Sequence, residues 1–113
     1  MSQITTHVLD VSIGRPAIGV PVVLEIGTPA GGWKELGRAF TDSDGRFGQF
    51  VAGHSLDEGV YRLIFDTSSY FNSRNVSGLY PRVIVEFEVR DSKAHYHIPL
   101  LLSPFAYSTY RGS

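Results

Sequence analysis

The sequence has 113 residues, of which 42% are apolar and 19% charged, and its formal net charge at pH 7 is −1. This composition fits one globular domain over residues 1–113, and the small net charge argues against nucleic acid as a partner, because phosphate binding needs a basic excess. The chain has no cysteine, which excludes disulfides, thiolate nucleophiles and cysteine-ligated zinc.

Alternation of apolar and polar side chains is the main structural signal along the chain. Residues 4–10 begin the pattern, with His7 and Leu9 on one face and Ile4 and Val8 on the other. Pro21 lies early in the second such segment, which indicates the start of a strand or an edge strand. The pattern predicts about eight strands, at residues 4–10, 20–26, 33–41, 46–51, 60–65, 82–90 and 95–102 and after residue 104.

Two segments between the strands carry their own signals. Asp42-Ser43-Asp44-Gly45 has the residues of a tight turn, and it places Arg46 at the mouth of a short strand. Asp66 can cap a helix of about two turns that ends near Ser73. This segment is the only helical candidate in the sequence. Because no βαβ alternation and no long 3.6-residue period appear, we expect an all-β antiparallel sandwich.

The last nineteen residues, 95–113, carry the least ordinary pattern. They read as two strands joined by a turn at Ser103-Pro104. One face of the first strand is a core face, formed by Tyr96, Ile98, Leu100 and Leu102. The other face places His95 and His97 beside Pro99 and Leu101, as the first strand places His7 beside Leu9. So apolar an outer face needs a cover, and we expect a second subunit to supply it and to enclose a small-ligand cleft.

The side chains on these outer faces suit hydrolysis by activated water. His7 and His97 can take a proton from water or return one to a leaving nitrogen. Arg46 offers a planar set of donors for a developing oxyanion, while Tyr110 and Ser113 can orient a substrate. No cysteine and no Gly-x-Ser-x-Gly elbow support a covalent nucleophile.

Two other interpretations stay open on the residues alone. His95 and His97 lie about 6.6 Å apart on one strand face, so with His7 they could hold zinc, although no carboxylate joins them. Taken singly, each histidine is more often structural, and His54 and His95 are expected to be exposed or structural. The same cleft could also serve a non-catalytic carrier of a small aromatic ligand.

Targeting signals are missing from the sequence as given. The first seven residues lack the basic and apolar regions of a secretory signal. No apolar run approaches the roughly 18 residues of a membrane span. We therefore expect a cytoplasmic protein without a membrane partner.

Three motifs together resemble a known family. They are Thr6-His7-Val8-Leu9-Asp10, Thr41-Asp42-Ser43-Asp44-Gly45-Arg46, and the run from His95 to the closing Tyr110-Arg111-Gly112-Ser113. The chain resembles the transthyretin-like family over essentially its whole length, and the closing tetrapeptide is typical of its 5-hydroxyisourate hydrolases. The hormone-binding transthyretins share the fold but lack the histidines and this tetrapeptide.

The resemblance implies a fold, an activity and an assembly. It implies a sandwich of two four-stranded sheets with one short helix near residues 66–74, and a homotetramer, a dimer of dimers, with active sites in the channel between the dimers. It implies hydrolysis of the small-molecule substrate 5-hydroxyisourate to 2-oxo-4-hydroxy-4-carboxy-5-ureidoimidazoline, without a metal or an organic cofactor. The implied catalytic residues are His7, Arg46 and His97, and the implied substrate-binding residues are Tyr110, Arg111, Gly112 and Ser113.

Overall fold

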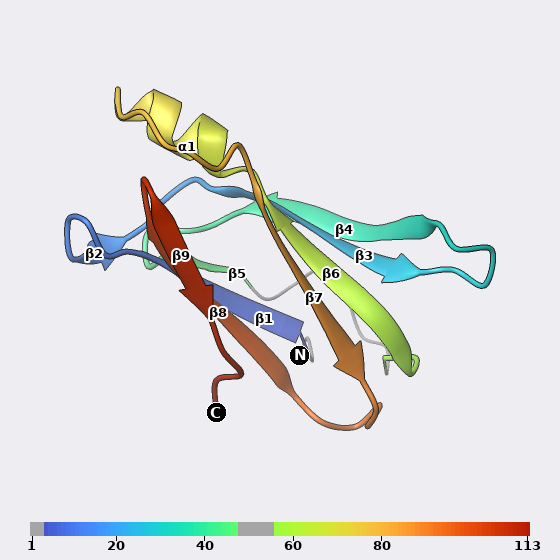
Figure 1. The fold of residues 1–113 in the computed structure, drawn as a ribbon. Coiled ribbons are helices and arrows are strands. Elements are labelled where there is room, and N and C mark those ends of the chain that lie inside the picture. Colours follow the sequence, from blue (N-terminus) through green and yellow to red (C-terminus); the bar gives the residue numbers. More distant parts are fainter. Residues whose placement is uncertain (1–3, 48–55) are drawn as a thin grey trace.

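Two β-sheets face each other in the computed structural model, which describes residues 4–47 and 56–113 (Figure 1). The elements are β1 (Ile4–Asp10), β2 (Arg15–Pro16), β3 (Pro21–Gly27), β4 (Trp33–Phe40), β5 (Arg46–Phe47), β6 (Gly59–Phe65), α1 (Thr67–Ser73), β7 (Val83–Val89), β8 (Tyr96–Ser103) and β9 (Ala106–Thr109). The prediction of a β-sandwich with one short helix is confirmed. The predicted strand positions 48–51 and the predicted loop residue His54 lie outside the described residues.

The first sheet has the order β2-β1-β8-β9, and β5 also pairs with β1. Residues 9–10 of β1 pair with β2, and residues 6–7 pair with β5. The two short strands therefore follow one another along the same edge of β1, because β8 occupies its other edge. Among the described residues this sheet has five strands but is only four positions wide, whereas the resemblance implied four strands in each sheet.

The pairing of β1 with β8 is parallel, and it runs over seven residues of each strand, from Ile4 and Tyr96 to Asp10 and Leu102. The other pairings in both sheets are antiparallel. Side-chain alternation fixes which face of a strand is buried but carries no information on strand direction. The sequence pattern therefore predicted the buried faces correctly and missed this one parallel pair.

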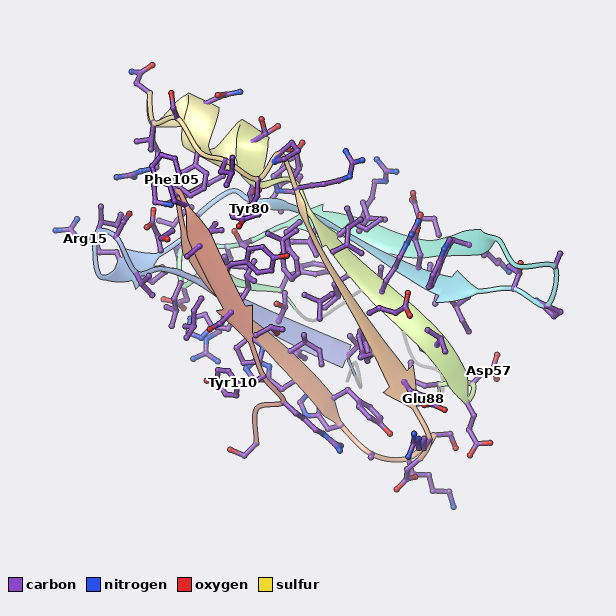
Figure 2. The ribbon with its side chains drawn as sticks, in the orientation of Figure 1. Arg15, Asp57, Tyr80, Glu88, Phe105 and Tyr110 are labelled. Carbon is purple, nitrogen blue, oxygen red and sulfur yellow. The ribbon has the colours of Figure 1, made fainter. Side chains whose placement is uncertain are left out.

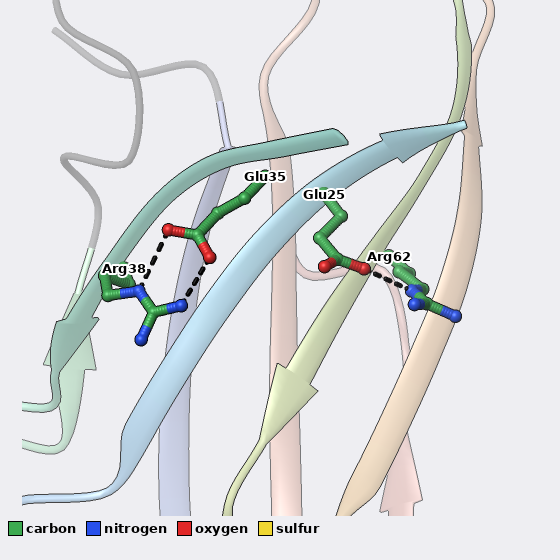
Figure 3. A network of polar contacts seen from close by, with 4 residues as sticks. All are labelled: Glu25, Glu35, Arg38 and Arg62. Atoms are coloured by element: carbon green, nitrogen blue, oxygen red, sulfur yellow. Dashed lines mark hydrogen bonds and ion pairs between the residues drawn. The ribbon is translucent and has the colours of Figure 1, made fainter. Parts of the chain in front are cut away.

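The second sheet has the order β4-β3-β6-β7. Its outer face carries ion pairs beside exposed apolar side chains such as Val60 and Ile84. Nε of Arg62 donates to Oε1 of Glu25 at 2.6 Å, and Arg38 pairs with Glu35 (Figure 3). Pro21 is the first residue of β3, which pairs with strands on both sides. The missing N–H of this proline thus falls at the strand's first position, where a central strand tolerates it.

The core lies between the sheets and contains the faces that alternation predicted. Its largest fully buried side chains are Ile4, Val8, Val20, Val22, Leu24, Tyr61, Leu63, Phe65, Val83, Val89, Leu100 and Leu102. Tyr96 and Ile98 of β8 are also buried. The core thus takes the even-numbered residues of β8, which leaves His97 on the outer face.

Helix α1 closes one end of the sandwich (Figure 1). The carboxylate of Asp66 caps it by accepting from the backbone N and the hydroxyl of Ser69 at 3.1 and 2.7 Å. Tyr70 is buried and donates to Oδ2 of the buried Asp10 at 2.8 Å. Burial, followed by this bond to a carboxylate, raises the pKa of Tyr70 to about 12. Within the described residues, no helix is long and apolar enough to cross a membrane.

Candidate active site

The outer face of the first sheet brings together residues that lie far apart in the sequence. Across β1, His7 pairs with Arg46 of β5 on one side and with Pro99 of β8 on the other. Two residues before His7 on β1, Thr5 pairs with His97, and His97 forms an isolated β-bridge to Gly112. Since paired residues share a face, the predicted catalytic residues from three strands stand on one surface.

Arg46 reaches this surface through the turn that precedes it. Oδ1 of Asp42 accepts from the backbone N of Asp44 at 2.9 Å and of Arg46 at 3.0 Å. Gly45 lies against β1, where its carbonyl accepts from the N of Val8 at 2.7 Å. Its φ is +75°, and a Cβ there would overlap the carbonyl oxygen of Val8. Only glycine therefore brings the turn close enough to set Arg46 beside His7.

The C-terminal segment folds back over β8. The backbone N of Gly112 donates to the carbonyl of His97 at 2.8 Å. A Cβ at Gly112 would overlap Cδ2 of His97 and lie 3.3 Å from Cγ of Pro99. Pro99 is buried within this single chain. The cover that the sequence led us to expect from a second subunit is thus partly supplied by the chain's own end.

A hollow of about 280 Å³ opens at this place, and we refer to it as the site hollow. Its lining residues are Thr5, Thr6, Arg46, Phe47, His95, His97 and Ser113. It therefore holds three of the predicted site residues, Arg46, His97 and Ser113. His7 does not line it but stands next to Arg46 in the sheet, and its charge acts on His97.

Tyr110 and Arg111 lie elsewhere. The guanidinium of Arg111 stacks 4.5 Å above the ring of Tyr96, and its Nη2 donates to the carbonyl of His95 at 3.2 Å. Tyr110 is exposed (Figure 2) and shares with Arg111 a second hollow that also includes residues of β7. Within one chain, the contacts of Arg111 fix the path of the terminal segment, and they do not place its guanidinium in the site hollow.

Thr5 and His95 are members of the site that sequence reasoning missed. Oγ1 of Thr5 lies 2.8 Å from Nε2 of His95 and 2.7 Å from Nδ1 of His97. His95 is exposed, as predicted, yet it also lines the site hollow. The signal was present in the alternation, since Thr5 shares a strand face with His7 and His95 shares one with His97. What the alternation did not give was the register that sets Thr5 beside His97.

The surroundings of His97 favour its neutral form. Burial lowers the pKa of the His97 imidazole, and the positive charges of His95, Arg46 and His7 lower it further. A neutral imidazole can accept a proton at neutral pH. The carboxylate of Asp42 beside Arg46 stays ionised, because the backbone N–H groups of Arg46 and Asp44 lower its pKa.

Among residues 4–47 and 56–113, no three histidine or carboxylate side chains stand close enough to hold a metal ion. The ring centroids of His95 and His97 are 6.4 Å apart, and the hydroxyl of Thr5 is bonded to a nitrogen of each ring. One nitrogen of each ring is therefore engaged by a hydroxyl. The chemistry that this arrangement supports is proton transfer between imidazoles, water and a ligand, next to a guanidinium that can stabilise negative charge.

Comparison with known proteins gives a consistent answer. A profile of the HIUase/Transthyretin family matches residues 4–112. A probable 5-hydroxyisourate hydrolase of Caenorhabditis elegans is 44% identical over 112 residues, which are 99% of this chain and 82% of that protein. The structure of Klebsiella pneumoniae 5-hydroxyisourate hydrolase superposes with a TM-score of 0.87 at 34% identity and covers 100% of both chains. Sea bream transthyretin in complex with thyroxine gives a TM-score of 0.91 at 29% identity, covering 97% of this chain and 94% of that one. The chain belongs to the HIUase/Transthyretin family.

Proposed function

We propose that this protein is a 5-hydroxyisourate hydrolase of urate degradation, acting without a cofactor through His7, Arg46 and His97. The observation that carries the proposal is the site hollow, where Arg46, His97 and Ser113 meet on one face with His7 beside them. Relatives above 40% identity over nearly the whole chain bear the name of this enzyme. A lone carrier site would not need two imidazoles and a guanidinium in register.

The reaction opens the six-membered ring of the substrate with one water molecule. His7 takes a proton from the water, and the water oxygen bonds to the ring carbonyl carbon. Arg46 stabilises the oxyanion that forms, as fixed donors do in acyl-transfer enzymes. The bond from this carbon to the ring nitrogen then breaks, and His97 supplies the proton that the leaving nitrogen needs. Ser113 lines the site hollow and Gly112 lies against His97, which supports a role for both in orienting the ring.

We propose that Tyr110 and Arg111 bind substrate only indirectly within one chain, by holding the terminal segment in place. The stacking of Arg111 on Tyr96 and its bond to His95 support this role. The assignment differs from a direct contact in one respect that can be measured. Arg111→Lys keeps the positive charge but loses the planar stack, so it should loosen the segment and raise KM more than it lowers kcat.

We propose that four copies assemble as a dimer of dimers and that the site hollow opens toward the interface between dimers. Exposed apolar side chains near the turn from β8 to β9 support an interface: Phe105 (Figure 2) is 69% exposed. Tyr107 packs its ring against that of Tyr80, with 5.1 Å between the ring centroids. Leu79 in the same patch is also exposed, and its backbone N–H donates to the carbonyl of Pro104 at 2.8 Å. Sedimentation velocity should give the mass of four chains, and Phe105→Glu should reduce it.

The decisive experiment follows the ultraviolet absorbance of freshly made 5-hydroxyisourate. With the protein present, the decay should be faster than the spontaneous decay, and His97→Asn or His7→Asn should cost about 10²- to 10⁴-fold in rate. Spontaneous-rate decay in the presence of folded wild-type protein would leave a carrier as the better reading. The thyroxine complex of sea bream transthyretin makes that carrier the second candidate, and equilibrium binding of a stable aromatic anion without turnover would support it.

A further inference from the structure

The hydroxyl of Thr5 occupies an unusual place between two imidazoles. Its oxygen lies 2.7 Å from Nδ1 of His97 and 2.8 Å from Nε2 of His95. Two other threonines of the same sheet behave differently. Thr6 donates to the carbonyl of Ile98 at 2.6 Å, and Thr109 donates to the carbonyl of Pro99 at 2.7 Å. These two satisfy the backbone, whereas Thr5 joins two groups that can each exchange a proton.

Hydrogen-bond arithmetic restricts the states of this trio, because a hydroxyl has one proton to donate. In the first state, Thr5 donates to Nδ1 of His97 and accepts from Nε2–H of His95, so neutral His97 carries its proton on Nε2. In the second state, Thr5 donates to Nε2 of His95 and accepts from Nδ1–H of His97, so Nε2 of neutral His97 is bare. The tautomer of one ring therefore sets the tautomer of the other.

Nε2 of His97 is the ring nitrogen that remains for the site hollow. Nδ1 faces Thr5, and the Cδ2 edge lies against Gly112. His95 forms the other end of the trio and is exposed to solvent. The trio thus joins His97 to a second ring, His95, which lines the same hollow and is also exposed to solvent.

We propose that Thr5 is a positioning residue that couples His95 and His97 into a proton relay between solvent and the site hollow. The inference rests on the proposed hydrolysis for its use, but the coupling itself does not depend on the substrate. In the supply direction, His95 gains a proton at Nδ1 from water and passes the proton on its Nε2 to the oxygen of Thr5. The hydroxyl proton of Thr5 moves to Nδ1 of His97, and the proton on Nε2 of His97 goes to the leaving nitrogen of the substrate.

This series of proton transfers is balanced, since one proton enters at His95 and one leaves at His97. It converts the first state of the trio into the second. The reverse series resets the trio: the proton that His7 took from the attacking water passes through water in the emptied site to Nε2 of His97, and Nδ1 of His95 releases one to solvent. Without the hydroxyl, neutral His97 would become an imidazolate anion when it gave up its Nε2 proton. Otherwise, it would have to be a cation, protonated on both nitrogens, before the transfer. Burial of the ring, and then positive charge on His95, Arg46 or His7, makes the cationic form costly.

The test replaces Thr5 and observes the rings directly. Thr5→Val removes the hydroxyl, Thr5→Ser keeps it, and Thr109→Val is a matched control that loses a hydroxyl bonded to a carbonyl of β8. In ¹⁵N-labelled protein, side-chain ¹⁵N shifts report the tautomer and the titration of each histidine ring. In the wild type, Thr5→Ser and Thr109→Val, titration of His95 should change the Nδ1 shift of His97 in a coupled, two-step curve. In Thr5→Val, the charge of His95 should still affect His97, but the tautomer of one neutral ring should no longer depend on the tautomer of the other.

Kinetics gives the second readout. Thr5→Val should lower kcat about tenfold, less than removal of the acid–base group itself, with KM little changed, and Thr5→Ser should recover most of the loss. The same tautomers of His95 and His97 in Thr5→Val and in the wild type would overturn the relay even if the enzyme hydrolyses 5-hydroxyisourate. Coupled rings in a protein without hydrolase activity would instead overturn the proposed function and leave the coupling intact. If Thr5→Val does not fold, His95→Asn decides, since an unchanged ¹⁵N pattern at His97 in that variant would also refute the relay.

Discussion

Gly112 lies flat against the imidazole of His97, with its backbone N bonded to the carbonyl of that same residue. No side chain fits between them, because a Cβ would overlap Cδ2 of the ring. The ring is thus held on two sides, by Thr5 at Nδ1 and by the terminal segment at Cδ2. Fixed orientation of an acid–base group is worth orders of magnitude in rate.

Gly112→Ala should therefore damage catalysis more than folding. The added methyl must push either the ring or the terminal segment aside, and we expect a loss of about 10²-fold in kcat/KM, in line with a misplacement of about 1 Å. Gly32→Ala is the matched control, since its Cβ would meet only the hydroxyl of Thr28, at 3.5 Å. Wild-type turnover by a folded Gly112→Ala protein would show that the close approach has no role in the reaction.

The turn that carries Arg46 gives a second pair of variants. Gly14 and Gly45 both have positive φ, at +65° and +75°, but only Gly45 has backbone in the way of a Cβ. Gly14→Ala should cost about 1 kcal/mol of unfolding free energy. Gly45→Ala should cost clearly more, about 3 kcal/mol, because strain and overlap with Val8 add. Urea unfolding followed by the fluorescence of Trp33 measures both, and equal losses would contradict the packing described for the turn.

The charge of Arg46 should be visible in the titration of His97. Burial and neighbouring positive charges lower the pKa of His97 from its ordinary value of 6.5. Arg46→Gln removes one of these charges, so the pKa should rise toward that value. Arg15→Gln removes an exposed charge from β2, which pairs with the opposite end of β1, and it should leave the pKa unchanged. A ¹⁵N or proton NMR titration of the imidazoles decides, and a downward movement in Arg46→Gln would refute the electrostatic account.

The buried pair of Tyr70 and Asp10 predicts how stability depends on alkaline pH. The pKa of Tyr70 is raised from 10 to about 12, so the folded chain keeps this proton where the unfolded chain loses it. The stabilisation is complete below pH 10 and falls as pH rises from 10 to about 12. Tyr70→Phe should cost about 2 kcal/mol at pH 7, and its disadvantage should shrink between pH 10 and 12. Tyr107→Phe removes the hydroxyl of an exposed ring and serves as the control in urea unfolding at both pH values.

Much of this arrangement could be predicted from the sequence, and the missing parts have physical causes. Alternation placed His7 and His97 on outer faces, and turn chemistry placed Arg46 at a strand mouth. Neither signal contains strand direction or register, so neither could set Thr5 beside His97 or Pro99 beside His7. The stacking of Arg111 on Tyr96 was not predicted for a related reason, since it depends on how the terminal segment crosses β8.

The parallel contact between β1 and β8 has a consequence for how the protein is made. The bond between Thr5 and His97 closes a loop with a sequence separation of 92 residues. A chain emerging from the ribosome must therefore keep this edge of its first strand unpaired until residues up to Ser103 have been synthesised. Such distant pairing makes for slow folding and leaves an apolar strand edge open to other chains. The protein's yield in cells should thus depend on what shields its first strand during translation.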